Sequence, residues 1–115
     1  MIKHTGYYIL DPIYFEDAIA NYSVNGYYHN AYLFLKNGTY LRASKKTDNK
    51  TNAIFYREDF NCDYPNRYRI SNGDLILTFY TGEEWEFNEI YKKKSVDWFE
   101  KEGKILKFVS WESLT

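Results

Sequence analysis

The most reactive side chains are few in this sequence and lie far apart. The two histidines are His4 and His29, and Cys62 is the only cysteine, so no disulfide can form within the chain. Metal sites use closely spaced His, Cys and acidic ligands, and the sequence has no such cluster. A Cys62–His29 dyad is chemically sound because catalytic partners need not be close in sequence, but nothing else supports it. We therefore expect a protein that is not an enzyme and that carries no metal or cofactor.

Acidic residues near the predicted turns offer a different chemistry. Glycoside hydrolysis requires two carboxylates at a set separation. The acids available for such a pair are Asp59, Asp63, Glu83 and Glu84. Acids in turns usually face solvent, because loops run over the protein surface. Enzymatic activity therefore ranks third among the possible functions, after ligand binding and protein binding.

Aromatic side chains are the most distinctive feature of the chain. They make up 21% of it, with 13 tyrosines, 8 phenylalanines and 3 tryptophans. Such residues pack well on a pleated, half-buried surface and so favour strands. A sheet that encloses them can bind a small apolar or amphipathic molecule, with an arginine fork anchoring its carboxylate. The residues expected to line this cavity are Tyr40, Arg42, Tyr68, Leu77, Phe79, Trp85 and Phe87.

Two alternatives to this cavity stay open. The same aromatic residues form a closed core if nothing is enclosed, and Arg42 and the alternative anchor Arg69 are then solvated or paired at the surface. The other alternative is a protein-binding surface, since tyrosine gives a large contact area at low entropic cost. Residues 22–32, YSVNGYYHNAY, would supply it on an inhibitor or immunity-type protein. Its contact residues would be Tyr22, Tyr27, Tyr28 and Tyr32.

Length and charge exclude several classes of protein. A chain of 115 residues is long enough for one domain with its own core. The net charge is −1 with acids and bases mixed, unlike the clustered basic surface of a nucleic-acid-binding protein. The one basic run, residues 92–94, is expected in a solvated loop.

Targeting signals are also missing from the sequence as it stands. No apolar stretch is long enough to span a bilayer. The segment MIKHTGYYIL lacks the apolar run of a signal peptide. The protein therefore either stays inside the cell or is a mature form, in the cell envelope or secreted, whose leader has been removed.

A hairpin pattern appears three times along the chain. The dipeptides Asn37-Gly38, Asn72-Gly73 and Glu102-Gly103 each stand between two strand-like runs. Such pairs favour a type I′ turn, which needs positive φ at both central residues. The third copy is the weakest, and a short helix over residues 96–101, capped by Ser95, is the alternative there.

The hydrophobic pattern predicts the register around these turns. A two-residue turn at Asn72-Gly73 sets Ile70 opposite Leu75 and Tyr68 opposite Leu77. Its apolar face carries Tyr68, Ile70, Leu75, Leu77 and Phe79, and its other face carries Arg67, Arg69, Ile76, Thr78 and Tyr80. A three-residue loop near Thr81-Gly82 sets Phe79 opposite Trp85 and Leu77 opposite Phe87. A two-residue turn at Asn37-Gly38 sets Leu35 opposite Tyr40 and Leu33 opposite Arg42.

The remaining segments complete an all-β domain. Further strands are predicted at residues 5–10, 53–59, 84–91 and 104–111. A short helix is predicted at residues 13–21, with Asp11 as N-cap and Pro12 at its first position. Residues 44–52 and 61–66 are predicted loops. Eight or nine strands joined in sequential hairpins, with at most one or two short helices, predict an antiparallel up-and-down β-barrel covering residues 1–115.

The order of strands and turns resembles that of small bacterial lipocalin-like (calycin-type) domains. The segments that carry the resemblance are Gly6-Tyr7-Tyr8, residues 34–40 (FLKNGTY) and residues 68–77 (YRISNGDLIL). Gly6-Tyr7-Tyr8 stands in the place of the family's first-strand Gly-x-Trp. The resemblance implies a barrel that holds one small apolar molecule, with no enzymatic activity.

Overall fold

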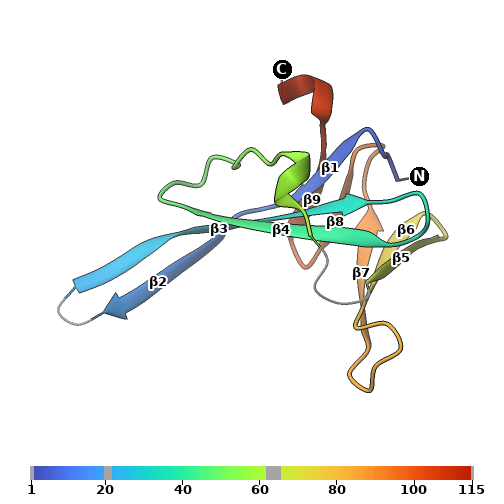
Figure 1. The fold of residues 1–115 in the computed structure, drawn as a ribbon, viewed down its shortest axis with the longest axis horizontal. Helices are drawn as coiled ribbons and strands as arrows, with labels where there is room; N and C mark the ends of the chain where they lie inside the picture. The colour runs from blue at the N-terminus through green and yellow to red at the C-terminus, as the bar shows by residue number, and fades with distance from the viewer. Residues whose placement is uncertain (1, 20–21, 62–65, 115) are drawn as a thin grey trace.

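Nine antiparallel strands form a single sheet in the computed structural model, which describes residues 2–19, 22–61 and 66–114, the side chains of 17–19, 22–24 and 113–114 excepted (Figure 1). The strands are β1 (Gly6–Leu10), β2 (Ile13–Ile19), β3 (Tyr22–Phe34), β4 (Tyr40–Thr47), β5 (Arg67–Ser71), β6 (Asp74–Phe79), β7 (Phe87–Lys93), β8 (Trp98–Lys101) and β9 (Lys104–Ser110). Two single-turn 3₁₀ helices, η1 (Arg57–Asp59) and η2 (Trp111–Leu114), accompany them. The all-β antiparallel fold with nine strands is therefore confirmed.

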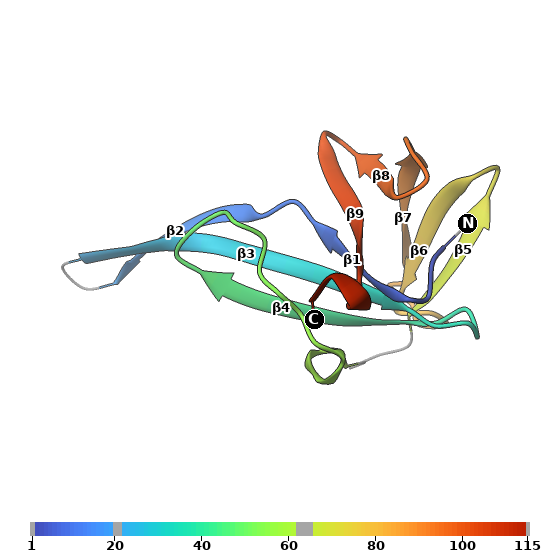
Figure 2. The same cartoon turned by 90° about the horizontal axis from the view of Figure 1, so that it is seen from above.

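The long strand β3 organises the first half of the sheet. Along one edge it pairs with β2 and then with β1, and along the other edge it pairs with β4. The outer part of the β2–β3 hairpin extends away from the rest of the molecule as an arm (Figures 1 and 2). β1 lies between β3 and β9, and β5 to β9 follow as consecutive hairpins. Pairing between consecutive strands thus holds except at β1, which lies between β3 and β9, and between β4 and β5.

The sheet is curved and barrel-like but is not closed. Figure 2 shows β5 to β9 turned out of the plane of the long β3–β4 pair. The edge strands β4 and β5 meet only near the β3–β4 turn, where Thr39 and Arg67 form an isolated bridge. The Tyr68 N–H donates to the Gly38 carbonyl there at 3.0 Å. A continuous ladder between these two edges is absent from the described residues.

Strand β1 is buried on both faces and separates two apolar clusters. The interior cluster, inside the curve of the sheet, comprises Ile2, Tyr8, Leu10, Tyr32, Phe34, Tyr40, Leu75, Leu77, Phe79, Tyr91, Phe99 and Leu106. The outer cluster, covered by residues 53–60 and Trp111, comprises Tyr7, Ile9, Ala31, Leu33, Ala43, Phe55 and Phe60. Gly6 lets β1 approach β9 closely, because a Cβ atom there would lie 2.0 Å from the Val109 carbonyl oxygen.

Two of the predicted type I′ turns are confirmed by their backbone angles. Asn72 and Gly73 have φ of 52° and 87°, and the predicted pairing of Ile70 with Leu75 is observed. Glu102 and Gly103 have φ of 51° and 82° and close the β8–β9 hairpin. The alternative helix over residues 96–101 is therefore wrong.

The turn at Asn37-Gly38 differs from the prediction. Asn37 does not have positive φ, whereas Gly38 has φ of 88° and its N–H donates to the Leu35 carbonyl. The Asn37 side-chain oxygen instead accepts the Thr39 N–H at 3.0 Å. One more residue therefore enters the loop, and the register shifts by one. The observed pairs are Phe34 with Tyr40, Leu33 with Leu41 and Tyr32 with Arg42.

The connection between β6 and β7 is longer than the predicted three-residue loop. Phe79 pairs with Phe87 and Leu77 with Glu89, so the predicted partners Trp85 and Phe87 are wrong. Tyr80 leaves β6 with φ of 56°. Its carbonyl then accepts the Glu83 N–H at 2.9 Å, which begins a compact loop over residues 80–86.

Three other segments also differ from expectation. Residues 13–19 form strand β2 rather than a helix, because β3 offers a continuous pairing partner. Asp11 does not cap a helix; its carboxylate accepts the Ile105 N–H at 2.9 Å and joins the end of β1 to β9. Residues 53–59 form no strand and contain η1, while β4 continues to Thr47 into the predicted loop. The basic run, residues 92–94, begins inside β7 rather than in a loop, although its side chains are exposed as expected. Of the loop predicted at residues 61–66, residues 62–65 lie outside the described part of the chain.

Candidate functional site

Three residues expected to line a ligand cavity belong to the packed interior. Tyr40 and Leu77 are fully buried, and Phe79 is 4% exposed. The Tyr40 ring lies edge-on to Phe79 with centroids 5.9 Å apart, and it lies 5.7 Å from the ring of Phe34. These contacts are those of a core, in line with the closed-core alternative for these side chains.

The other four predicted residues lie elsewhere. Tyr68 lines the wall of the interior, where its ring is 4.8 Å from Phe34 and its hydroxyl donates to the Leu35 carbonyl at 2.6 Å. Arg42 lies at the open end of the sheet. Trp85 is 60% exposed and Phe87 46% exposed, both at the β6–β7 loop. The sequence pattern thus selects Trp85 and Phe87 as ligand-binding residues but places them inside a cavity, whereas both side chains are exposed at the surface.

The β6–β7 loop holds its aromatic side chains in a defined arrangement. Phe87 stacks on Phe79 with centroids 4.7 Å apart and an interplanar angle of 11°. Tyr80 contacts both Trp85 and Phe87 at 6.3 and 6.1 Å. Positive φ at a bulky residue such as Tyr80 costs about 1–2 kcal/mol, which the surrounding contacts must offset.

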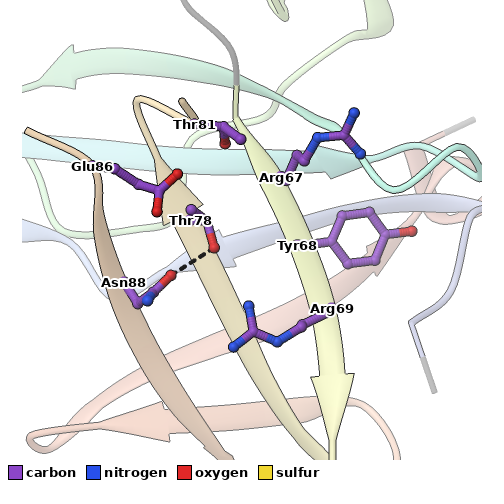
Figure 3. A pocket seen from close by; sticks show the side chains of 7 residues that line it. All are labelled: Arg67, Tyr68, Arg69, Thr78, Thr81, Glu86 and Asn88. Atoms are coloured by element: carbon purple, nitrogen blue, oxygen red, sulfur yellow. Dashed lines mark hydrogen bonds between the residues drawn. The ribbon is translucent and has the colours of Figure 1, made fainter. Parts of the chain in front are cut away.

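A polar groove of ≈ 440 Å³ adjoins this loop on the outer face of β5, β6 and β7. Its lining residues are Arg67, Tyr68, Arg69, Thr78, Thr81, Glu86 and Asn88 (Figure 3). Strand alternation aligns Arg67, Thr78 and Asn88 in one row across the three strands. The Thr78 hydroxyl donates to the Asn88 side-chain oxygen at 2.6 Å. Figure 3 shows the Arg69 side chain extending toward β6, on the side of β5 opposite to Tyr68.

The groove offers several hydrogen-bond donors. Arg67 and Arg69 are exposed, and neither side chain forms an ion pair within the described parts of the chain. Glu86 is the acid that lines the groove, and its carboxylate already accepts the Gly82 N–H at 2.9 Å. The buried Thr81 hydroxyl has no hydrogen-bond partner among the described residues. This arrangement suits a partner that brings acceptor groups, carboxylates above all.

We define the β5–β7 surface as this groove together with the exposed Trp85 of the adjoining loop. Its members are Arg67, Tyr68, Arg69, Thr78, Thr81, Trp85, Glu86 and Asn88. Alternation opposite the apolar face predicts that Arg67, Arg69 and Thr78 lie together. The sequence pattern misses the contributions of Thr81 and Asn88, because they depend on the length of the β6–β7 loop.

The tyrosines of residues 22–32 do not form one exposed patch. Tyr32 is buried in the interior cluster, and the side chain of Tyr22 lies outside the described residues. Tyr27 and Tyr28 are half-buried in the arm and, as neighbours on a strand, face opposite sides. Each pairs with a ring of β2, at centroid distances of 5.4 and 4.5 Å.

The histidines have structural surroundings. His29 is fully buried; its Nε2 lies 2.6 Å from the Thr47 hydroxyl and its Nδ1 accepts the Ala53 N–H at 3.5 Å. His4 Nδ1 donates to the Phe34 carbonyl at 3.0 Å. Cys62 lies outside the described residues, so the dyad with His29 has no geometry to test.

The acids suited to glycoside chemistry are equally dispersed. Asp59 accepts the Tyr56 N–H at 2.7 Å and pairs with Lys45 at 3.0 Å, and these contacts hold its pKa below the ordinary value. Glu83 and Glu84 are exposed on the β6–β7 loop, and Asp63 is not among the described residues. Within residues 2–19, 22–61 and 66–114, no group of three His, Cys, Asp or Glu side chains could hold a metal ion.

Comparison with other proteins gives no relative from which to transfer a function. No family model, no curated protein and no solved structure matches the chain significantly. Among the described residues no helix is long and apolar enough to cross a membrane. The candidate function therefore depends on the geometry of the β5–β7 surface.

Proposed function

We propose that this protein is a non-enzymatic binding module that recognises a protein partner through the β5–β7 surface. The observation that carries the proposal is the exposure of Trp85 on an ordered loop whose residues Thr81 and Glu86 line the groove together with Arg67 and Arg69. Tryptophan, tyrosine and arginine dominate the binding energy of protein interfaces. Arginine also matches carboxylates with its planar fork, which gives such an interface polar specificity.

The order of the loop favours binding as well. A side chain that is already fixed loses less conformational entropy when a partner covers it. Here the Tyr80 ring contacts Trp85, the Phe87 ring at the start of β7 contacts Tyr80 in turn, and the Gly82–Glu86 hydrogen bond closes the loop. The surface therefore presents Trp85 without a large ordering cost.

A small apolar ligand inside the barrel has less support from the geometry. Tyr40, Leu77 and Phe79 fill the space that the ligand would occupy, and displacing them would disrupt the interior cluster. The lipocalin-like resemblance stays a prediction, and such a fold is compatible with either function.

The proposal is tested by placing a photo-crosslinking phenylalanine analogue at position 85 in cells of the source organism. The matched control carries the same analogue at Val96, which is 68% exposed on the β7–β8 turn outside the surface. We expect one discrete protein adduct at position 85 that is absent at position 96. With the trapped partner in hand, Trp85→Ala should weaken binding about 30-fold, corresponding to ~2 kcal/mol, and Val96→Ala should not. Identical adduct patterns at the two positions, or no adduct at position 85, would contradict the proposal.

A further inference from the structure

Strand β5 stands at one end of the sheet order, so only one of its two edges has a neighbouring strand along most of its length. The type I′ turn at Asn72-Gly73 closes on the pair Ser71 and Asp74, whose backbone groups bond to each other. Along an antiparallel strand, residues that bond to the neighbour alternate with residues whose backbone groups point away from it. The N–H and C=O groups of Ile70 therefore point away from β6.

The hydrogen bond of the preceding outward-facing residue agrees with this direction. The Tyr68 N–H donates to the Gly38 carbonyl of the β3–β4 turn at 3.0 Å, on the side opposite to β6. Past this contact, no described residue forms a backbone hydrogen bond to β5 from that side. We call residues 69–71 the open edge of β5. Its free backbone groups are the N–H and C=O of Ile70, which can pair with an added strand.

The open edge has a basic face and an apolar face. Arg67 and Arg69 are exposed on the outer face, without an ion pair among the described residues. Figure 3 shows Arg69 extending toward β6 and Arg67 extending to the opposite side of β5. Glu86, the acid that lines the groove, lies on the β7 side and accepts the Gly82 N–H. On the other face of β5, Ile70 is 38% exposed. A strand that complements this edge therefore carries acids on one face and apolar residues on the other.

We infer that the partner of the β5–β7 surface docks an extended segment of alternating acidic and apolar residues on the open edge of β5. The inference rests on the proposed function and specifies the chemistry of the partner. An added antiparallel strand bonds to both the N–H and the C=O of Ile70. Its residue opposite Arg69 then lies on the outer face and diagonal to Arg67, so an acid there attracts both guanidinium groups. The residues before and after that acid face the other side and cover Ile70.

A suitable probe is the peptide acetyl-Thr-Val-Glu-Val-Glu-Val-Thr-amide, with a control peptide in which lysine replaces each glutamate. We expect the glutamate peptide, titrated into the ¹⁵N-labelled protein, to shift the amide resonances of β5. At saturation it should slow hydrogen exchange at the Ile70 N–H at least about fivefold, because that group becomes hydrogen-bonded. The lysine peptide should bind at least about tenfold more weakly, since its charges repel the two arginines.

Protein variants separate the backbone contribution from the charge contribution. Ile70→Pro removes the outward N–H but no bond to β6, so it should weaken the glutamate peptide at least about tenfold. Ile70→Val keeps the N–H and is its matched control. The double variant Arg67→Gln/Arg69→Gln should weaken the same peptide about fivefold. Lys50→Gln removes an exposed charge from the loop after β4, far from β5 in Figure 1, and should have no effect.

Three results would overturn the inference: no binding of the glutamate peptide, equal affinity for the two peptides, or binding that leaves exchange at Ile70 unchanged. These measurements use the unmodified protein, so they decide the question even if Ile70→Pro folds poorly. Exchange at Ile70 that slows with protein concentration alone would identify a second copy as the occupant and would also overturn it.

The inference and the proposed function fail in different ways. A protein trapped at position 85 that binds Ile70→Pro as tightly as the unmodified protein would overturn the inference and leave the proposed function standing. Binding of the glutamate peptide at the open edge, with no adduct at position 85, would contradict the proposed function and leave the edge as a site for acidic strands.

Discussion

Two groups of aromatic residues meet in this protein and have opposite surroundings. In the interior cluster Phe34 is 1% exposed and its ring contacts those of Tyr8, Tyr40 and Tyr68. On the β6–β7 loop Trp85 is largely exposed although Tyr80 supports it. Aromatic character therefore does not decide which residues form the core; strand register and loop length do. The same residue type stabilises the fold at one position and remains accessible to a partner at the other.

The largest expected effect separates the two groups by stability. Phe34→Ala removes a ring surrounded by other rings, so it should lower the free energy of unfolding by about 3–5 kcal/mol. Trp85→Ala should change it by no more than about 0.5 kcal/mol, because its surroundings are mostly solvent. Urea unfolding followed by tyrosine fluorescence and circular dichroism measures both. Equal losses for the two variants would show that the loop belongs to the core.

A backbone substitution extends the comparison to β1, the strand most deeply buried. Gly6→Ala places a methyl group against the Val109 carbonyl, which must move together with β9. We expect a loss of about 1–3 kcal/mol, the usual cost of overpacking. A melting temperature equal to that of the unmodified protein would mean that the β1–β9 pair separates easily, in contrast to its position between the two clusters.

The exposed side of the sheet gives a smaller, pH-dependent effect. Asp74 accepts the Lys93 N–H and pairs with Lys92, each at 3.0 Å, and these contacts lower its pKa in the folded state. The unfolded pKa is about 3.9, so the stabilisation is complete above that pH and is lost as the pH falls through the lower folded pKa. Asp74→Asn keeps an acceptor but has no charge to titrate. The stability difference between the two proteins should therefore shrink on acidification; a constant difference from pH 6 to pH 2 would refute this origin.

The smallest expected effect concerns the β8–β9 turn, whose first central residue is not the type that favours positive φ. Glu102 has positive φ at the first position of the type I′ turn, where asparagine is favoured. Glu102→Asn should raise stability by about 0.5–1 kcal/mol through the relief of backbone strain. The Asn72-Gly73 turn, which already has the favoured pair, is the internal reference. A destabilised variant would indicate that the Glu102 side chain makes a stabilising contact that asparagine does not replace.

Local signals explain the part of the fold that the sequence predicts well. Asn72-Gly73 defines its own turn, and alternation on both sides then determines the register of β5 and β6 and the polar row of Arg67 and Thr78. The same dipeptide at Asn37-Gly38 gives a longer loop, which places Tyr40 and Arg42 on the face that meets the interior. Burial on that face depends on distant strands, which the flanking residues do not reveal.

Nonlocal pairing also explains the wrong predictions for β2 and for the site. The Asp11-Pro12 signal favours a helix locally, yet β3 provides seven pairing positions for β2 and prevails. The sequence pattern marks Trp85 as a binding residue but assigns it to a cavity, because the length of the β6–β7 loop cannot be read from its glycine alone. A pocket of ≈ 260 Å³ at the open end of the sheet combines residues from seven strands and the β8–β9 turn, so Arg42 is the one predicted ligand-binding residue among its lining.

The position of β1 has a consequence for how the chain folds. Gly6 pairs with Ser110, and Tyr8 with Phe108. Strand β1 is therefore without one of its two neighbouring strands until β9, the last strand of the chain, has been synthesised. Proteins dominated by such distant contacts fold slowly, over milliseconds to seconds. During synthesis the apolar side chains of β1 would remain partly uncovered until β9 leaves the ribosome. Assembly of this sheet is therefore expected to finish late and in a single cooperative step.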